Sequence, residues 1–137
     1  MDAAYRKPVP EITSDTRTYW EGLKQGRLLL QRCAECGRIR HYPRPVCDAC
    51  FSMKVDWVPA SGKGTVHSWT VTHHPFHAGF KEELPFTLVT VDLEEGVRLN
   101  AQARGIGDNE LRVGLPVRIG IEKATEEFSL PVVLPAG

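Results

Sequence analysis

The stretch RCAECGRIRHYPRPVCDAC, residues 32–50, contains all four cysteines of this chain. They form two Cys-x-x-Cys pairs with ten residues between the pairs. This spacing is typical of zinc ribbons, in which each pair forms a tight turn that points both sulfurs at one tetrahedral metal ion. We therefore predict one structural zinc ion, with the ligands Cys33, Cys36, Cys47 and Cys50.

The turns that follow the two pairs differ in one residue. Gly37 follows the first pair and can adopt the positive φ that such a turn often needs. Phe51 follows the second pair and cannot adopt it at low cost. We regard this as a modest departure from the pattern of a zinc ribbon.

Redox chemistry and disulfides are the alternative uses of these cysteines. A thioredoxin-like pair lies at the start of a helix in an α/β fold, and no such pattern surrounds them. Disulfides are rare in the cytoplasm. We expect a cytoplasmic location because the sequence shows no apolar signal segment and no apolar run of the roughly 20 residues that a membrane span needs.

The chain divides into three segments around the cysteines. Residues 1–30 contain a predicted short helix that ends near Gly26. Residues 31–56 form the cysteine module, which is too small to fold around a core of its own. Residues 57–137 are predicted to be β-structure throughout.

Five short strands are expected in the third segment. Apolar and polar residues alternate clearly in two of them, and no crossover helices separate them. A small closed antiparallel barrel of the five-stranded OB type is the most economical architecture, with a sandwich as the alternative. The strand sequences are GTVHSWTVTHH (64–74), FTLVTVDLEEG (86–96), VRLNAQARG (97–105), LPVRIGIEKA (115–124) and LPVVLP (130–135).

Charge gives little support to a nucleic-acid-binding role. The chain has 17 Lys and Arg and 17 Asp and Glu, which leaves no net charge. Residues 1–56 carry +3 and residues 57–137 carry −3. Proteins that bind nucleic acid usually have a basic excess on one face, so we expect no nucleic-acid partner.

Two clusters of side chains are candidates for contact with a ligand or partner. The first cluster crowds the cysteine module, where it can either form a solvated face or meet the phosphates of coenzyme A. It consists of Arg32, Arg38, Arg40, His41 and Arg44, of which Arg38, Arg40 and Arg44 are the contact candidates. The second cluster is predicted to form a polar and aromatic loop, for which a second metal site or a general base is the less favoured interpretation. It consists of His73, His74 and His77, with Phe76 and Phe80 in the same loop; His73, His74 and Phe76 are the contact candidates.

The helix of the first segment presents a third candidate surface. Tyr19, Trp20 and Leu23 lie on one of its faces. We predict that a partner protein covers this face and that Trp20 is its anchor. The alternative is that the barrel and the cysteine module of the same chain cover it.

Six segments of the chain, taken in order, resemble the family labelled domain of unknown function 35. The resemblance runs from Tyr19 to Pro135 and is specific because the whole series is uncommon, although each part is not. The segments are YWEGLKQGRLLLQRCAECG (19–37), PRPVCDAC (43–50), GKGTVHSWTVTHHP (62–75), LPFTLVTVDLEEGVRL (84–99), GLPVRI (114–119) and LPVVLP (130–135).

This resemblance implies both a fold and a role. The fold is an N-terminal helical hairpin, a rubredoxin-like zinc ribbon and a C-terminal OB barrel. The role is that of an accessory subunit in a hetero-oligomer with a thiolase-fold enzyme, which forms or breaks carbon–carbon bonds of acyl-CoA substrates. Thiolysis, hydroxymethylglutaryl-CoA synthesis and retro-aldol cleavage of steroid side chains are the reactions known for such enzymes.

By the same resemblance, the catalytic residues lie on the partner and a coenzyme A thioester is a possible ligand. The sequence itself agrees that this chain has no catalytic residues, because no serine or free cysteine lies in the context of a nucleophile and base. A zinc-ribbon and OB nucleic-acid-binding module and a stand-alone enzyme remain the alternatives.

Overall fold

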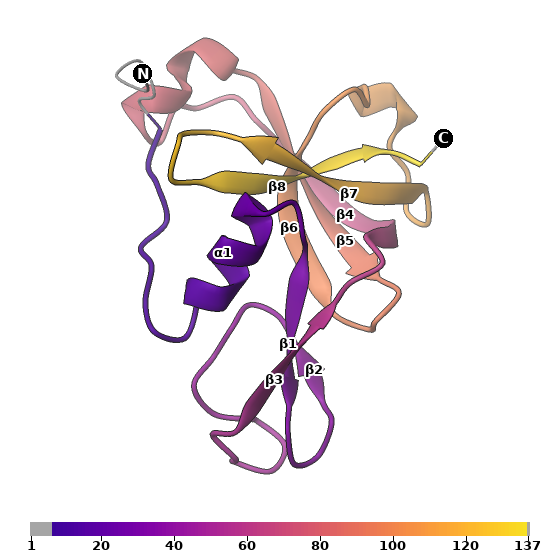
Figure 1. Cartoon of the computed structure of the whole chain (residues 1–137). Coiled ribbons are helices and arrows are strands. Elements are labelled where there is room, and N and C mark those ends of the chain that lie inside the picture. The colour runs from indigo at the N-terminus through magenta and orange to yellow at the C-terminus, as the bar shows by residue number, and fades with distance from the viewer. Residues whose placement is uncertain (1–6, 137) are drawn as a thin grey trace.

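The computed structural model describes residues 7–136, which form one helix, a small sheet and a closed barrel (Figure 1). The helix and the sheet precede the barrel in the chain. Their bounds are α1 (Arg17–Lys24), β1 (Leu29–Cys33), β2 (Ile39–Arg40) and β3 (Val55–Pro59). The barrel contains β4 (Lys63–Thr72), β5 (Phe86–Leu93), β6 (Arg98–Ala103), β7 (Pro116–Lys123) and β8 (Ser129–Pro135), with the 3₁₀ turns η1 (Ala78–Glu83) and η2 (Asp108–Glu110) in its loops.

Helix α1 is the single helix of the N-terminal segment within the described residues. The helical hairpin implied by the resemblance is therefore wrong for residues 7–30, where one helix is present. It ends at Lys24, two residues before Gly26, whose φ of 81° no right-handed helix can continue. In the described part of the chain, no helix has the length and apolar character needed to cross a membrane.

The sheet of the cysteine module has the strand order β2-β1-β3, and both of its strand pairs are antiparallel. Strand β1 begins at Leu29, and β3 ends at Pro59. The boundaries predicted after residues 30 and 56 therefore lie within strands of this sheet, and they stay predictions of domain limits. The sheet carries the cysteine turns at the end that points away from the barrel (Figure 1).

The five strands of the barrel follow the order β4-β5-β6-β8-β7 and close through a β4–β7 pair. The predicted OB-type barrel is confirmed, but one part of that prediction needs correction. Strands β6 and β8 pair in parallel, so the barrel is not antiparallel throughout. The reason is the β7–β8 hairpin, which inserts β8 between β7 and β6 and so gives β8 the direction of β6.

The interior of the barrel is filled by one face of the alternating strands. Leu99 and Ala101 of β6 are buried, whereas Arg98 and Asn100, which alternate with them along the strand, are exposed. Burial of each aliphatic side chain contributes about 1.5–3 kcal/mol to folding. The same apolar cluster includes Leu30 of β1 and residues of α1, so the barrel, the sheet and the helix share one core.

Candidate metal centre and ligand pocket

The two cysteine turns bring four sulfur atoms to one point at the end of the small sheet. All four Sγ atoms lie within 4.8 Å of one another, with 3.5 Å between Cys33 and Cys50 and 3.6 Å between Cys36 and Cys47. Zinc–sulfur bonds of about 2.3 Å in a tetrahedron place the sulfurs about 3.8 Å apart. The geometry therefore fits a zinc ion, and the four-cysteine ribbon supports a structural zinc as its cofactor.

Backbone hydrogen bonds favour the thiolate form of the two buried cysteines. The N–H group of Cys36 donates to Cys33 Sγ and lowers the pKa of that thiol to about 6. Bonds from the N–H groups of Cys50 and Ala49 lower the pKa of Cys47. A zinc ligand must be deprotonated, so these bonds prepare Cys33 and Cys47 for metal binding. Four thiolates leave no open coordination position, which makes the site structural.

Three arginines of the cysteine module line a polar hollow of about 500 Å³ next to the β5–β6 turn. Arg38 is exposed and pairs with Asp48 at 3.1 Å. Arg40 is buried, and its Nη2 donates to the backbone oxygen of Arg44 at 3.0 Å. Arg98, which the sequence analysis did not single out for this cluster, extends the hollow from β6 and pairs with Asp92.

The histidine and phenylalanine candidates lie far from the arginines. His73, His74 and Phe76 are exposed on the connection from β4 to η1, at the end of the molecule opposite the cysteine turns (Figure 1). The rings of His74 and Phe76 meet edge to face at 4.7 Å. Among residues 7–136, the four cysteines are the one group placed to share a metal ion, so these histidines do not form a second site there.

The apolar face of α1 is covered by the chain itself. Tyr19 and Leu23 are 2% and 1% exposed, and Trp20 is 9% exposed. Trp20 Nε1 donates to the hydroxyl oxygen of Tyr42 at 2.9 Å, and its indole ring meets Phe128 edge to face. The predicted partner interface at Tyr19, Trp20 and Leu23 is therefore corrected, because these side chains belong to the core of this chain.

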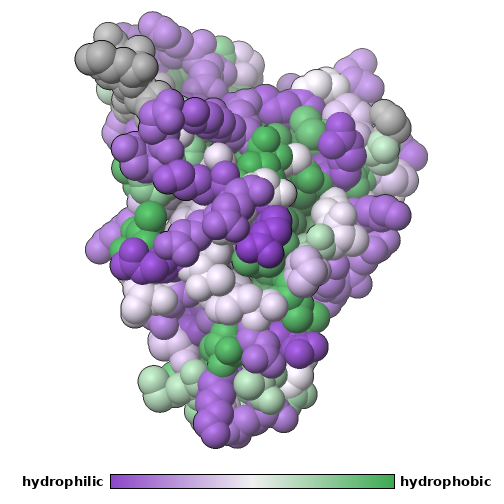
Figure 2. Space-filling model, viewed as in Figure 1, coloured by the Kyte–Doolittle hydropathy of each residue, from purple (hydrophilic) through white to green (hydrophobic). Residues whose placement is uncertain are grey.

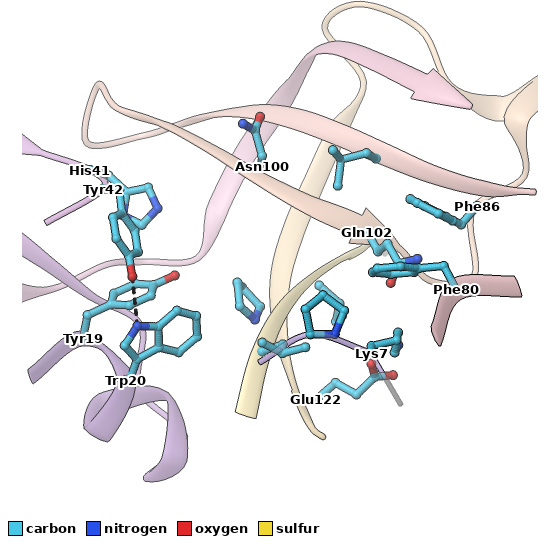
Figure 3. Close-up of a pocket in the computed structure, with 15 residues that line it drawn as sticks. Lys7, Tyr19, Trp20, His41, Tyr42, Phe80, Phe86, Asn100, Gln102 and Glu122 are labelled. Carbon is cyan, nitrogen blue, oxygen red and sulfur yellow. Dashed lines mark hydrogen bonds between the residues drawn. The ribbon is translucent and has the colours of Figure 1, made fainter. Parts of the chain in front are cut away.

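A cavity of about 450 Å³ opens beside Trp20, between α1, the loop after β2 and the outer surface of β5 and β6 (Figure 3). Its walls are mostly aromatic and aliphatic, and a few amide and charged groups lie among them. The labelled lining residues are Lys7, Tyr19, Trp20, His41, Tyr42, Phe80, Phe86, Asn100, Gln102 and Glu122.

Burial shifts the pKa of two polar groups that line this cavity and leaves a third group without a hydrogen-bond partner. Burial raises the pKa of Tyr19 above its ordinary value, and the neighbouring Tyr42 raises it further. Burial, together with the charge of Arg44, lowers the pKa of His41 to about 4, so this imidazole is neutral at pH 7. Gln102 Nε2 is buried without a hydrogen-bond partner, which leaves its two N–H donors for a ligand.

Most residues of this cavity carry no signal in the sequence. The alternation in VRLNAQARG (97–105) puts Asn100 and Gln102 on the polar side of their strand, but it does not say that this side faces α1. Tyr42 and Phe86 carry no motif, since they meet Trp20 and Phe80 only through the tertiary fold. His41 lies between the two sites, because it lines both this cavity and the arginine hollow.

Family comparisons agree with the two-part architecture. A model of the ChsH2 rubredoxin-like zinc ribbon domain matches residues 20–56, and a model of the ChsH2 C-terminal OB-fold domain matches residues 57–122. A DUF35 domain-containing scaffold protein of Pyrococcus furiosus is 32% identical over 79% of this chain and 79% of its own length.

Two further relatives are described as enzyme components. A probable enoyl-CoA hydratase alpha subunit of Thermomonospora curvata is 42% identical over 95% of this chain, but the chain spans only 40% of that relative. A solved structure described as an Ltp2-ChsH2(DUF35) aldolase contains a chain that is 40% identical, with a TM-score of 0.85. The match covers 94% of the present chain and 100% of that one.

Proposed function

The chain belongs to the DUF35 family, and from this premise we propose that it is a non-catalytic accessory subunit of an acyl-CoA enzyme whose catalytic partner is a thiolase-fold protein. One observation carries the proposal. The full length of a chain from the Ltp2-ChsH2(DUF35) aldolase matches nearly the whole of this chain. This match supports a role for the present chain as one component of such an enzyme.

The chemistry of the described residues supports a non-catalytic role. The four cysteines that could serve as nucleophiles are gathered into a site with no open metal position. The buried imidazole of His41 has a pKa of about 4, well below the range in which a general base works at neutral pH. The chain therefore offers binding surfaces, and the proposal assigns bond formation and cleavage to the partner.

We extend the proposal to binding of the acyl-CoA itself. The aromatic cavity beside Trp20 has the size and the apolar walls that suit an acyl group. The hollow with Arg38, Arg44 and Arg98 has guanidinium groups that suit phosphates. His41 lines both sites, so one extended thioester can reach from the hollow into the cavity.

Co-purification tests the proposed subunit role. The native chain is isolated with its binding partners, which are then identified by mass spectrometry. We expect a thiolase-fold subunit in stoichiometric amount and no acyl-CoA turnover by the chain alone. Turnover by the partner-free chain, or a stoichiometric partner of another fold, would contradict the proposal.

Two variants test acyl-CoA binding separately. Leu88→Arg places a charged side chain in the wall of the cavity, where Leu88 is half exposed. Arg44→Glu reverses a charge in the hollow. We expect each to weaken acyl-CoA binding to the complex about tenfold or more, while Val113→Arg, an exposed site that lines neither hollow nor cavity, leaves it unchanged. Equal affinity in all three variants would remove this chain from the ligand site.

A further inference from the structure

The two cysteine turns share one backbone geometry but differ in the residue that completes it. In the first turn, the Gly37 N–H group donates to the oxygen of Cys33 at 2.9 Å. In the second turn, the Phe51 N–H group donates to the oxygen of Cys47, also at 2.9 Å. The φ angles are 79° for Gly37 and 64° for Phe51. Both residues therefore occupy the left-handed region, which glycine adopts freely and other residues adopt at a cost.

Phe51 is unusual in both conformation and exposure. Among residues 7–136 it is the single non-glycine residue with a positive φ. Its side chain is 78% exposed, so burial within the chain does not offset the conformational cost. A residue held in an unfavourable conformation with its apolar side chain in water indicates a function for that side chain.

Two further apolar side chains belong to the same turn. Met53 is 72% exposed and Val46 is 38% exposed. The hydrogen bond from Cys47 N to Ser52 O closes the turn. Val46 directly precedes Cys47 in the chain, and Met53 directly follows Ser52. We call Val46, Phe51 and Met53 the ribbon tip. Figure 2 shows moderately apolar residues, in pale green, beside hydrophilic ones at the lower end of the molecule.

The surroundings of the ribbon tip are close to electrically neutral. Residues 29–59 contain five arginines and lysines and three acids, and four thiolates on a zinc ion cancel the remaining +2. All three acids are paired with cations of the same segment. The pairs are Glu35–Lys54, Asp48–Arg38 and Asp56–Arg32, at 3.5, 3.1 and 3.4 Å.

Neutrality decides which class of partner suits the ribbon tip. Nucleic acids and anionic membranes are bound through an excess of positive charge, which this end of the chain does not have. A protein groove with apolar walls and little net charge complements it, because large apolar side chains are the residues that anchor protein interfaces. The face of α1 is already covered, so it does not compete for this role.

We propose that the ribbon tip docks into an uncharged apolar groove of the partner subunit and that Phe51 is the anchor of this contact. The identity of the partner rests on the function proposed above. The position of the contact rests on the conformation and exposure of Phe51. The zinc site then has a role in the complex, since it holds the turn that presents the anchor.

The test measures the affinity of the full chain for the co-purified partner subunit by titration calorimetry. Phe51→Gly removes the anchor while it suits the left-handed backbone, so we expect the variant to keep its zinc and to bind at least about 30-fold more weakly. Met53→Ser is a second variant that leaves the turn residue unchanged, with an expected loss of about fivefold or more. Val113→Gly is the matched control, because Val113 is 73% exposed in the barrel loop between η2 and β7 and belongs to none of the candidate contact clusters.

The outcomes separate this inference from the proposed function. Wild-type affinity in both Phe51→Gly and Met53→Ser overturns docking by the ribbon tip, even if the partner is a thiolase-fold protein. Loss of affinity for a stoichiometric partner of another fold supports the ribbon tip and overturns the proposed function. A chain dimer or an oligonucleotide complex that Phe51→Gly abolishes, with binding to the partner unchanged, also overturns the inference.

Discussion

The cysteine module, called the ribbon below, and the barrel are stabilised in opposite ways. The cysteine turns of the ribbon depend on four cysteines at fixed spacings, and two of these are buried among few other apolar groups. The barrel depends on many aliphatic side chains, such as Val89 and Leu99, none of which has a unique chemical role. Loss of one cysteine therefore removes the basis of its region, whereas loss of one aliphatic residue weakens a core that many others still support.

Removal of zinc is expected to have the largest effect. Structural zinc sites of small domains contribute about 10–16 kcal/mol of apparent binding free energy, and nothing in the lower ribbon replaces it. We predict that Cys47→Ser abolishes zinc binding and unfolds the cysteine turns, while the circular dichroism of the barrel strands persists. Ala49→Ser, an exposed change within the same turn, is the control and retains stoichiometric zinc by elemental analysis. Full unfolding of the barrel in Cys47→Ser would show that the two regions are not separable.

Trp20 tests the contact between the ribbon and the rest of the core, which we call the joint. It packs against Tyr19 with ring centroids 4.9 Å apart and bonds to Tyr42 of the ribbon loop. We predict that Trp20→Ala lowers the free energy of unfolding by about 3–5 kcal/mol, measured by urea denaturation. Trp20→Phe keeps most of the packing and loses the hydrogen bond, so its loss should be smaller. If Trp20→Ala instead kept full stability and lost only the partner, the core assignment of Trp20 would be wrong.

The sequence predicted the parts of the molecule whose residues lie close together in the chain. The cysteine turns and the alternation in residues 97–105 each depend on neighbours within a few positions, and the structure has the expected geometry at both. Contacts between distant segments were not predictable in the same way. The cover over Trp20 comes from Tyr42 and Phe128, and a single helix face does not specify whether its own chain or a partner will cover it.

The parallel β6–β8 pair shows the same limit. Strand patterns identify the strands but not which of them become neighbours when a barrel closes. The aromatic cavity is likewise a product of closure, because its walls come from the N-terminal segment, the ribbon loop and the barrel. Phe51 is a different case. The sequence already showed it as unusual, because it follows a cysteine pair at the position where the other turn has a glycine. Its φ of 64° confirms that the turn needs a positive φ at this position.

His41 makes the joint sensitive to acid. Its pKa is about 4 in the folded chain and 6.5 ordinarily, so between these values the unfolded chain binds a proton that the folded chain does not. Stability is therefore lost as the pH falls from 6.5 to 4, by about 2–3 kcal/mol from this group. His41→Phe keeps an aromatic ring beside Tyr19 and cannot titrate. Urea denaturation across this window should give a shallower acid loss for the variant, and parallel curves would assign the loss to other groups such as the thiolates.

The smallest predicted effects compare the two cysteine turns with each other. Gly37 and Phe51 both have positive φ, and a Cβ at Gly37 would meet no atom within 4 Å, so a substitution there changes backbone energy without a clash. We predict that Gly37→Ala destabilises the chain by about 1 kcal/mol and that Phe51→Gly stabilises it by about 1 kcal/mol or less, because the greater freedom of glycine in the unfolded chain offsets part of the relief. Thermal unfolding of both zinc-bound variants tests this, because the unfolding temperature should fall for Gly37→Ala and rise for Phe51→Gly. A destabilised Phe51→Gly would mean that the phenyl ring supports its own turn, and the cost of its conformation would then no longer point to a partner.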